Sequence, residues 1–268
     1  MNIDQTLYGN KKRAEFVLSA IKPLSAANIL DFGCGTGKLL TIPLAKKLKN
    51  VTFHAVDNHK GSIDAATQAN DLPNLSFYTK IPQEPDKYDM IILSDVLEHV
   101  DDPTLLLRQL NEHLKSNGKL LLTIPNGYGP FEFIILLRSL FVLVLDLLKI
   151  KIIPQNIMIT TLADSPHINF FSFKEINSII NKTNYRIINQ RNRTIFCGFL
   201  FNLLSIIPGA VRLNAWLADY LHPSLVSGWM FVCAPSPGKS AAKVDYQNDT
   251  YYKRVKRYLN TQISAKQI

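Results

Sequence analysis

Three glycines at alternate positions, Gly33, Gly35 and Gly37, follow a short apolar run and precede a segment that favours a helix. Glycine has no Cβ, so a strand-to-helix turn built from it can be tight and can approach a ligand closely. Asp31 lies near the end of the apolar run, and Asp57 follows Gly37 by twenty residues. A carboxylate at the end of the second strand can accept hydrogen bonds from both hydroxyls of a ribose. These residues therefore predict a site for an adenosine-containing ligand.

The spacing and charge of this loop indicate which adenosine compound binds. A dinucleotide favours the pattern G-x-G-x-x-G, because its pyrophosphate rests on the helix amino terminus, and here the third glycine comes one residue early. The loop also lacks the Lys-Ser/Thr pair of a phosphate loop, since Leu39 follows Lys38. The acidic Asp31 repels a pyrophosphate but attracts the ammonium and sulfonium groups of S-adenosylmethionine. We therefore predict S-adenosylmethionine as the cofactor.

Two segments resemble a known family. Residues 29–37 (ILDFGCGTG) resemble the first motif of class I S-adenosylmethionine-dependent methyltransferases, and residues 95–103 (DVLEHVDDP) resemble the segment after strand four in the branch with ubiquinone-biosynthesis O-methyltransferases. The resemblance covers about residues 25–130 and implies a doubly wound, Rossmann-like α/β sheet of seven strands whose last strand is antiparallel. Residues 125–132 and 167–172 look like segments of bacterial methyltransferases of unassigned substrate.

The resemblance also implies a set of cofactor-binding residues. These are Asp31, Gly33, Cys34, Gly35, Gly37, Asp57, Asn58, Ile81, Ser94 and Asp95. One position departs from the family pattern. Members often place an acidic or amide residue just after strand three to meet the adenine amino group, whereas residues 78–81 read Tyr-Thr-Lys-Ile. We therefore expect backbone groups and Ile81 to hold the adenine.

Two histidines are candidates for a catalytic base. His99 follows the fourth predicted strand, at the edge where doubly wound sheets bind ligands, and His167 precedes the aromatic pair at 170–171, which is expected to line an acceptor pocket. A base is needed only when the acceptor must lose a proton, and either histidine can instead be a structural hydrogen-bonding residue. The resemblance permits a divalent metal at Asp95, Glu98 and His99, but such clusters often occur without metal and we predict none.

Hydrophobic periodicity predicts the elements that position these residues. Strands are expected at 28–32, 51–57, 75–78, 88–94, 119–124, 185–190 and 228–233. Helices are expected at 11–22, 38–48, 62–69 and 103–116. The last of these starts after a capping Asp102 and stops at Asn117-Gly118. The regular alternation favours right-handed βαβ units.

Residues 131–150 are apolar at fifteen of twenty positions. The polar positions fall within an arc of roughly 120° on a helix, which predicts a helix with a very wide apolar face. Its charges argue against a transmembrane span. The helix either caps the core or lies in a bilayer interface. Residues 195–213 repeat this apolar character.

Length and composition favour one folded domain with an insertion, since 47% of the 268 residues are hydrophobic and 19% are charged. We assign the domain to 1–236, with a core at 25–126, a hydrophobic helical cap at 131–165 and the C-terminal part of the sheet at 166–236. A basic, flexible tail is expected at 237–268. It holds seven Lys or Arg and two Asp, or +5 of the chain's net +9. Such a tail attracts phosphate surfaces or is simply solvated.

The three cysteines lie far apart and no secretory signal precedes the domain, so a reducing cytoplasm is expected. The apolar segments favour a small-molecule, lipid-like or cell-envelope precursor as acceptor, methylated at oxygen, and peripheral contact with an anionic membrane. A noncatalytic cofactor-binding scaffold is an alternative that the intact glycine loop disfavours. A nucleic-acid methyltransferase ranks lower, because no Asn-Pro-Pro-Tyr type sequence follows strand four, and no nucleic-acid partner is expected.

Overall fold

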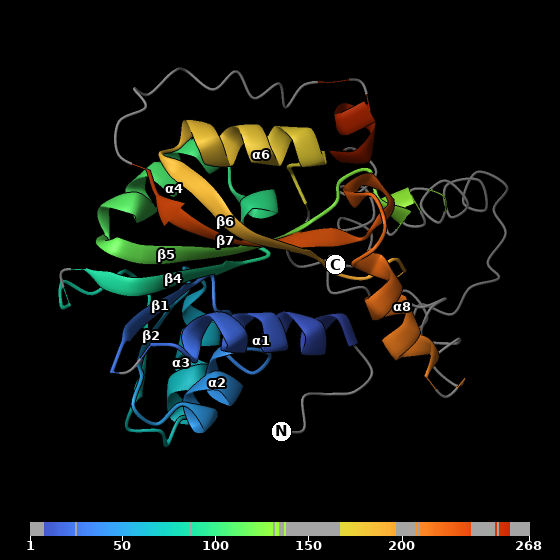
Figure 1. Ribbon diagram of the computed structural model, residues 1–268. Coiled ribbons are helices and arrows are strands. Elements are labelled where there is room, and N and C mark those ends of the chain that lie inside the picture. The colour runs from blue at the N-terminus through green and yellow to red at the C-terminus, as the bar shows by residue number, and fades with distance from the viewer. Residues whose placement is uncertain are drawn as a thin grey trace, which may run out of the picture.

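A seven-stranded sheet with the order β3-β2-β1-β4-β5-β7-β6 runs through the computed structural model (Figure 1). The strands are β1 (Asn28–Phe32), β2 (Thr52–Val56), β3 (Leu75–Tyr78), β4 (Tyr88–Ser94), β5 (Leu114–Pro125), β6 (Tyr185–Asn192) and β7 (Gly228–Pro235). The helices are α1 (Tyr8–Ile21), α2 (Thr41–Lys47), α3 (Lys60–Gln68), α4 (Pro103–Glu112), α6 (Phe173–Lys182) and α8 (Ala210–Ala218), with the 3-10 turns η1 (Leu97–His99) and η3 (Pro223–Leu225). The structure describes residues 8–24, 26–85, 87–130, 132, 133, 137, 167–196, 207, 209–236, 250 and 252–257.

Strand direction confirms the predicted doubly wound, Rossmann-like class. β1 pairs in parallel with β2 and β4, β2 with β3, and β4 with β5. The last strand, β7, pairs antiparallel with both β5 and β6. Parallel neighbours need crossover connections, which the helices after β1, β2 and β4 supply. The carboxyl ends of these strands therefore lie along one edge of the sheet, where folds of this class bind ligands.

The sheet is buried on both faces. In β4, Met90, Ile91, Ile92 and Leu93 are all 0% exposed, as a nearly continuous apolar run predicts for a central parallel strand. One face packs against α1 and α2 and the other against α4 and α6, and Figure 1 shows these pairs on opposite sides of the sheet. This packed core fixes the positions of the loops that leave the strand ends.

One predicted helix boundary is wrong. α4 begins as predicted, with Asp102 accepting hydrogen bonds from two first-turn amides at 2.9 Å, but it ends at Glu112 rather than at residue 116. Leu114 already pairs with Tyr88, so Asn117-Gly118 lies inside β5, where the register with β4 shifts. Glycine is common at such strand irregularities. Pairing with β4 therefore outweighs the local helix stop.

β5 correspondingly starts at Leu114 instead of the predicted residue 119, and the remaining boundaries differ by at most three residues. α2 starts at Thr41, three residues after the predicted start, and this places Pro43 in the first turn, where proline is tolerated. α6 and α8 were not predicted. α6 carries a capping box between Ser172 and Glu175, a sequence pattern that could have revealed it.

Most of the predicted apolar helix at 131–150 lies outside the described residues, so the cap and the domain boundaries stay predictions. No helix among the described residues is both long enough and apolar enough to cross a membrane. Residues 252–257, inside the predicted tail, pack on the domain, with Lys253 0% and Lys256 3% exposed. The expectation of a solvated tail is corrected for this segment, because both lysines pair with carboxylates of the fold.

Candidate functional site

The glycine loop between β1 and α2 has backbone angles that glycine adopts most readily. Gly33, Gly35 and Gly37 have φ values of 79°, 55° and 67°, in the left-handed region. The amides of Gly33 and Cys34 donate to the Val56 carbonyl at 2.7 and 3.0 Å, which ties the loop to the end of β2. A Cβ added to Gly35 would meet no atom within 4 Å. The backbone at Gly35 therefore borders space that a ligand can fill.

Asp57 closes this loop from the end of β2. Its Oδ2 accepts a hydrogen bond from the Gly35 amide at 2.7 Å, and its Oδ1 accepts one from the His59 amide at 2.9 Å. Each carboxylate oxygen keeps a further lone pair. Asp57 is therefore held in place by the backbone and can still accept two hydrogen bonds from the hydroxyls of a ligand.

Asp31, next to last in β1, is a buried carboxyl group beneath the loop. It is 2% exposed and accepts a hydrogen bond from Thr41 Oγ1 of α2. Burial and the nearby Asp57 raise the pKa of Asp31 to about 6, although Thr41 and Arg13 act in the opposite direction. A cation bound beside Asp31 would favour its charged form.

The glycine loop contacts the segment after β4. A Cβ added to Gly33 would lie 2.4 Å from Cγ2 of Val96. Position 33 therefore requires glycine for two reasons: Val96 leaves no room for a Cβ, and the backbone has a positive φ. The two segments that resemble the methyltransferase family, 29–37 and 95–103, meet in space at this contact.

Asp95 joins three elements at this edge of the sheet. Its φ of 55° is uncommon for a residue other than glycine. Its carboxylate accepts hydrogen bonds from Arg13 of α1 at 2.5 Å, from Arg193 after β6 at 2.9 Å and from Thr123 of β5 at 3.0 Å. Burial opposes its charge, but the two guanidinium groups bring the pKa of Asp95 down to about 2. Asp95 thus organises the site through three donors, and its contact with a cofactor stays a prediction.

The two histidines predicted as candidate bases lie together. The ring centroids of His99 and His167 are 5.0 Å apart in an edge-on arrangement. One possible ligand atom from each of Glu98, His99 and His167 lies within 4.8 Å of the others. The amides of Ile168 and Asn169 donate to the Glu98 carbonyl at 2.8 and 3.0 Å, which holds the two segments against each other.

Glu98 is the buried acid of this cluster. It is 1% exposed, and its Oε2 has no hydrogen-bond partner among the described residues. Burial and the charge of Asp95 raise the pKa of Glu98 to about 8, so the carboxyl group keeps its proton at neutral pH. Asp95, Glu98 and His99 do not form the metal site that the family resemblance permits. The reason is that two arginines already bind the Asp95 carboxylate. With His167 in its place, the cluster could hold a divalent cation or exchange a proton.

A buried chain of ion pairs lies behind His167. Its Nδ1 is 3.0 Å from Glu132 Oε1, and Lys256 Nζ is 2.6 Å from Glu132 Oε2. His167, Glu132 and Lys256 are 8%, 2% and 3% exposed. Burial alone lowers the pKa of His167, but the hydrogen bond to Glu132 and the nearby carboxylates outweigh it and raise this pKa. The chain therefore favours the charged form of His167.

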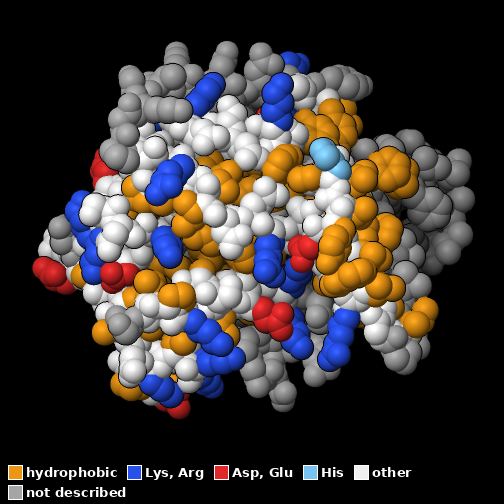
Figure 2. Space-filling view, in the orientation of Figure 1, with side chains coloured by type: hydrophobic (Ala, Val, Ile, Leu, Met, Phe, Trp, Pro, Cys, Tyr) orange, Lys and Arg blue, Asp and Glu red, His pale blue; other side chains and the backbone are white. Residues whose placement is uncertain are grey.

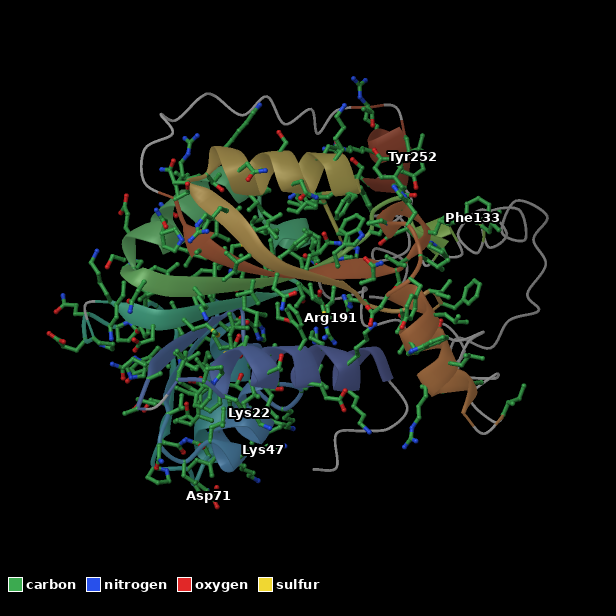
Figure 3. All side chains as sticks on the ribbon, viewed as in Figure 1. Lys22, Lys47, Asp71, Phe133, Arg191 and Tyr252 are labelled. Atoms are coloured by element: carbon green, nitrogen blue, oxygen red, sulfur yellow. The ribbon has the colours of Figure 1, made fainter. Side chains whose placement is uncertain are left out.

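Aromatic and polar contacts hold the C-terminal segment that supplies Lys256. Tyr252, labelled in Figure 3, stacks on Tyr128 with ring centroids 4.9 Å apart and donates to the Gly127 carbonyl at 3.3 Å. Lys253 Nζ lies 2.9 Å from Glu175 Oε1 at the start of α6. Residues from far along the chain thus complete the surroundings of His167.

The remaining predicted residues lie along the same edge of the sheet. Cys34 and Ile81 are partly buried, and Asn58 is exposed beside Asp57. Ser94 Oγ lies 3.0 Å from Thr123 Oγ1. Their contacts with a cofactor stay predictions. The aromatic pair 170–171 is 1% exposed at both positions, so it packs in the core, and the expectation that it lines an acceptor pocket is corrected.

Sequence reasoning missed Arg13, Arg193, Glu132 and Lys256. Arg13 is one of three consecutive basic residues, and nothing in their spacing marks the one that points inward. Glu132 carries a weak signal, since an acid in an apolar segment is costly to bury without a partner. Lys256 stands in a basic stretch that has the composition of a solvated tail.

Comparisons with known proteins agree with this site. A family model described as a methyltransferase domain matches residues 9–190, and the chain belongs to this family. The ubiquinone biosynthesis O-methyltransferase of Rickettsia typhi is 40% identical over 118 residues, which cover 41% of this chain and 47% of that protein. The chain spans about half the length of the curated relatives it matches.

Solved structures share the fold at low sequence identity. PKMT2 from Rickettsia typhi in complex with AdoHcy matches with a TM-score of 0.51 and 16% identity, over 83% of this chain and 51% of that chain. The cyclase SpnF matches with a TM-score of 0.56 and 11% identity, over 85% of this chain and 81% of that chain. At these identities the likeness concerns the fold alone. The reaction must be argued from the site.

Replacing Asp31 with Asn should stabilise the ligand-free protein more at high pH than at low pH. The folded pKa of about 6 lies above the ordinary aspartate value, so ionising Asp31 destabilises the fold as the pH rises through this range. At ~1.4 kcal/mol per pKa unit, the advantage of Asp31→Asn in urea unfolding should grow by up to about 2 kcal/mol between pH 4 and pH 8. Asp64→Asn on the exposed face of α3 is the control. An advantage that stays constant with pH would contradict this account.

Lys256→Met should lower the free energy of unfolding by ~1 to 3 kcal/mol, because the buried Glu132 loses one cationic partner and keeps His167 as the other. Lys60→Met removes the exposed pair with Asp64 and should lower it by less than ~1 kcal/mol. Urea unfolding of both variants tests the difference. Adding Glu132→Gln to Lys256→Met should recover part of the loss. Equal effects of the two lysine variants would show that the buried pair does not stabilise the fold.

Proposed function

We propose that this chain transfers the methyl group of S-adenosylmethionine to an oxygen of a small-molecule or lipid-like acceptor. The observation that carries the proposal is a turn with glycine at three of its five positions, with Asp31 beneath it and Asp57 beside it. Gly35 borders open space, and two backbone amides orient Asp57. Family membership supports methyl transfer, and the O-methyltransferase relatives support oxygen as the methylated atom.

Charge favours S-adenosylmethionine over a phosphate-containing nucleotide. The sulfonium and ammonium groups give the buried Asp31 a cationic partner, whereas a pyrophosphate would add negative charge beside Asp31 and Asp57. The ribose hydroxyls donate to Asp57, and Ile81 borders the adenine. The other residues expected around the cofactor are Gly33, Cys34, Gly37, Asn58, Ser94 and Asp95.

The protein must align the acceptor with the methyl group and remove a proton. The positive sulfur already activates the methyl group, and alignment can supply ~7 to 11 kcal/mol of the barrier. An acceptor hydroxyl loses its proton as the new carbon–oxygen bond forms, which calls for a neutral histidine nearby. The raised pKa of His167 favours its charged form, and His99 lies beside it, with the two ring centroids 5.0 Å apart. We therefore assign His99 as the base and His167 as its charged neighbour.

We place this reaction in the cytoplasm, on a membrane surface. Cys34 and Cys233 are free thiols, which suits a reducing compartment. The chain's net charge of +9 suits contact with anionic lipid. A lipid, a quinone precursor or a cell-envelope saccharide intermediate is the acceptor class that fits such a location.

Asp57→Ala and Gly35→Val should each weaken S-adenosylmethionine binding by at least about tenfold, or ~1.4 kcal/mol. The first removes the acceptors of the ribose hydroxyls, and the second puts a side chain into the space of the ligand. Calorimetry with the methyl donor and its demethylated product tests both variants, with Asp64→Ala as the matched control. Tight binding of a nicotinamide dinucleotide by the wild type, with no heat from either sulfur compound, would overturn the proposal.

His99→Ala should slow methyl transfer by ~10²- to 10⁴-fold without changing the affinity for the donor. Transfer of tritium from a labelled methyl donor to lipid extracts and phenolic quinone precursors measures the rate. His167→Gln removes the charged neighbour of His99 and should slow methyl transfer by less than His99→Ala does, since it leaves the base in place. His222→Ala, at an exposed histidine, is the control. A wild-type protein that binds the donor but labels no acceptor would instead be a noncatalytic scaffold.

A further inference from the structure

Helix α8 buries its small residues and leaves its large apolar residues in water. Its inner face holds the buried Asn214, Ala215 and Ala218. The large residues on the outer face and in the turn after it are Leu213, Trp216, Leu217 and Tyr220, which are 54%, 56%, 38% and 72% exposed. At about 100° per residue these four lie within an arc of roughly 100°. An amphipathic surface helix normally has the opposite arrangement.

Two neighbouring residues extend this apolar face. Phe196 and Ile207 are 49% and 56% exposed. Asn214 Nδ2 donates to the Phe196 carbonyl at 2.9 Å, and the Ala210 amide donates to the Ile207 carbonyl at 3.1 Å, so both residues adjoin α8. We define the α8 surface as Phe196, Ile207, Leu213, Trp216, Leu217 and Tyr220. Figure 2 shows hydrophobic side chains gathered on the right of the view, where Figure 1 places α8. A contiguous patch of this kind marks an interaction site.

The α8 surface lies at the same edge of the sheet as the candidate site. β6 ends at Asn192, whose Nδ2 donates to the Ala218 carbonyl of α8 at 2.8 Å. The next residue, Arg193, reaches Asp95 of the site at 2.9 Å. A partner that covers the α8 surface therefore lies close to the segment that shapes the site.

Basic side chains border the α8 surface. Arg212 is exposed on α8 itself. Arg191, labelled in Figure 3, is a second exposed cation, and its charge is near enough to add to burial in lowering the pKa of Lys12. Lys12 itself pairs with Asp219 at 2.9 Å, so this pair adds no net charge. An apolar face with a tryptophan and a tyrosine, bordered by cations, matches the headgroup region of an anionic bilayer.

A second copy of this chain is a poorer occupant of the α8 surface. A symmetric dimer would bring the two basic borders together, and they would repel each other. The bilayer surface offers the complementary charge.

We propose that the α8 surface docks this protein on an anionic membrane, with Trp216 and Tyr220 at the level of the lipid headgroups. An acceptor held in the bilayer then enters beside Arg193, at the edge that carries the histidine pair. Docking itself is independent of the reaction. Only the delivery of a lipid-like acceptor rests on the proposed function.

The two tryptophans of the chain allow docking to be observed directly. Trp216 is 56% exposed and Trp229 is 0% exposed, so a change of fluorescence on lipid addition reports on Trp216. Vesicles of phosphatidylglycerol and phosphatidylcholine should shift the emission to shorter wavelength, and Trp216→Phe should abolish the shift. Vesicles of phosphatidylcholine alone, or about 1 M salt, should weaken it, because both remove the electrostatic attraction.

Leu213→Asp keeps the reporter but puts a charge into the α8 surface, so the affinity for the anionic vesicles should fall by at least about tenfold. Leu105→Asp adds the same charge at a 51% exposed position on α4 and should dock like the wild type. The inference fails if the wild type ignores anionic vesicles or if Leu213→Asp docks equally well. It also fails if light scattering shows a dimer that Leu213→Asp dissociates, since the occupant is then a second copy. Calorimetry with S-adenosylmethionine on the same proteins separates this failure from a failure of the proposed function.

Discussion

Carboxyl groups at the ends of β1 and β4 are largely withdrawn from water, and the arrangement of cations around them organises the site. A buried carboxylate without a partner takes up a proton instead of remaining charged. Asp95 stays ionised, with a pKa of about 2, because two arginines hold it, whereas Glu98 keeps its proton, with a pKa of about 8. The pKa of Asp31, about 6, falls between the pKa values of Asp95 and Glu98. With a pKa below neutral, Asp31 is largely ionised at pH 7, and a cation bound beside it would stabilise this charged form.

Distant segments of the chain supply the compensating charges. Arg13 comes from α1, Arg193 follows β6, and Lys256 lies in the C-terminal segment. The site is thus complete only when β6 and β7 have joined the sheet and residues 252–257 have docked. Glu132 connects two of these segments, because the same carboxylate contacts Lys256 and His167.

The family match ends at residue 190, before α8 and the C-terminal segment. The elements beyond that point carry the α8 surface and Lys256. The family match therefore supports a reaction class but says nothing about these elements. The likeness to a cyclase of the same fold makes the same point, since a shared sheet does not specify a reaction.

Local features of the site are readable from the amino-acid sequence. The φ values near Gly33, Gly35 and Gly37 are a property of the residue type, and a continuous apolar run is enough to predict the buried β4. The sheet alone decided that α4 ends at Glu112, because pairing of Leu114 with Tyr88 outweighs a local stop signal.

Tertiary structure also decided the charges around the site. His99 meets His167, and Arg13 meets Asp95, across long stretches of chain that no periodicity connects. Backbone preference and hydrophobic period act between neighbours in sequence, whereas ion pairing and burial act through space. The sequence therefore determined the glycine loop, and only the folded chain decided which charges surround it.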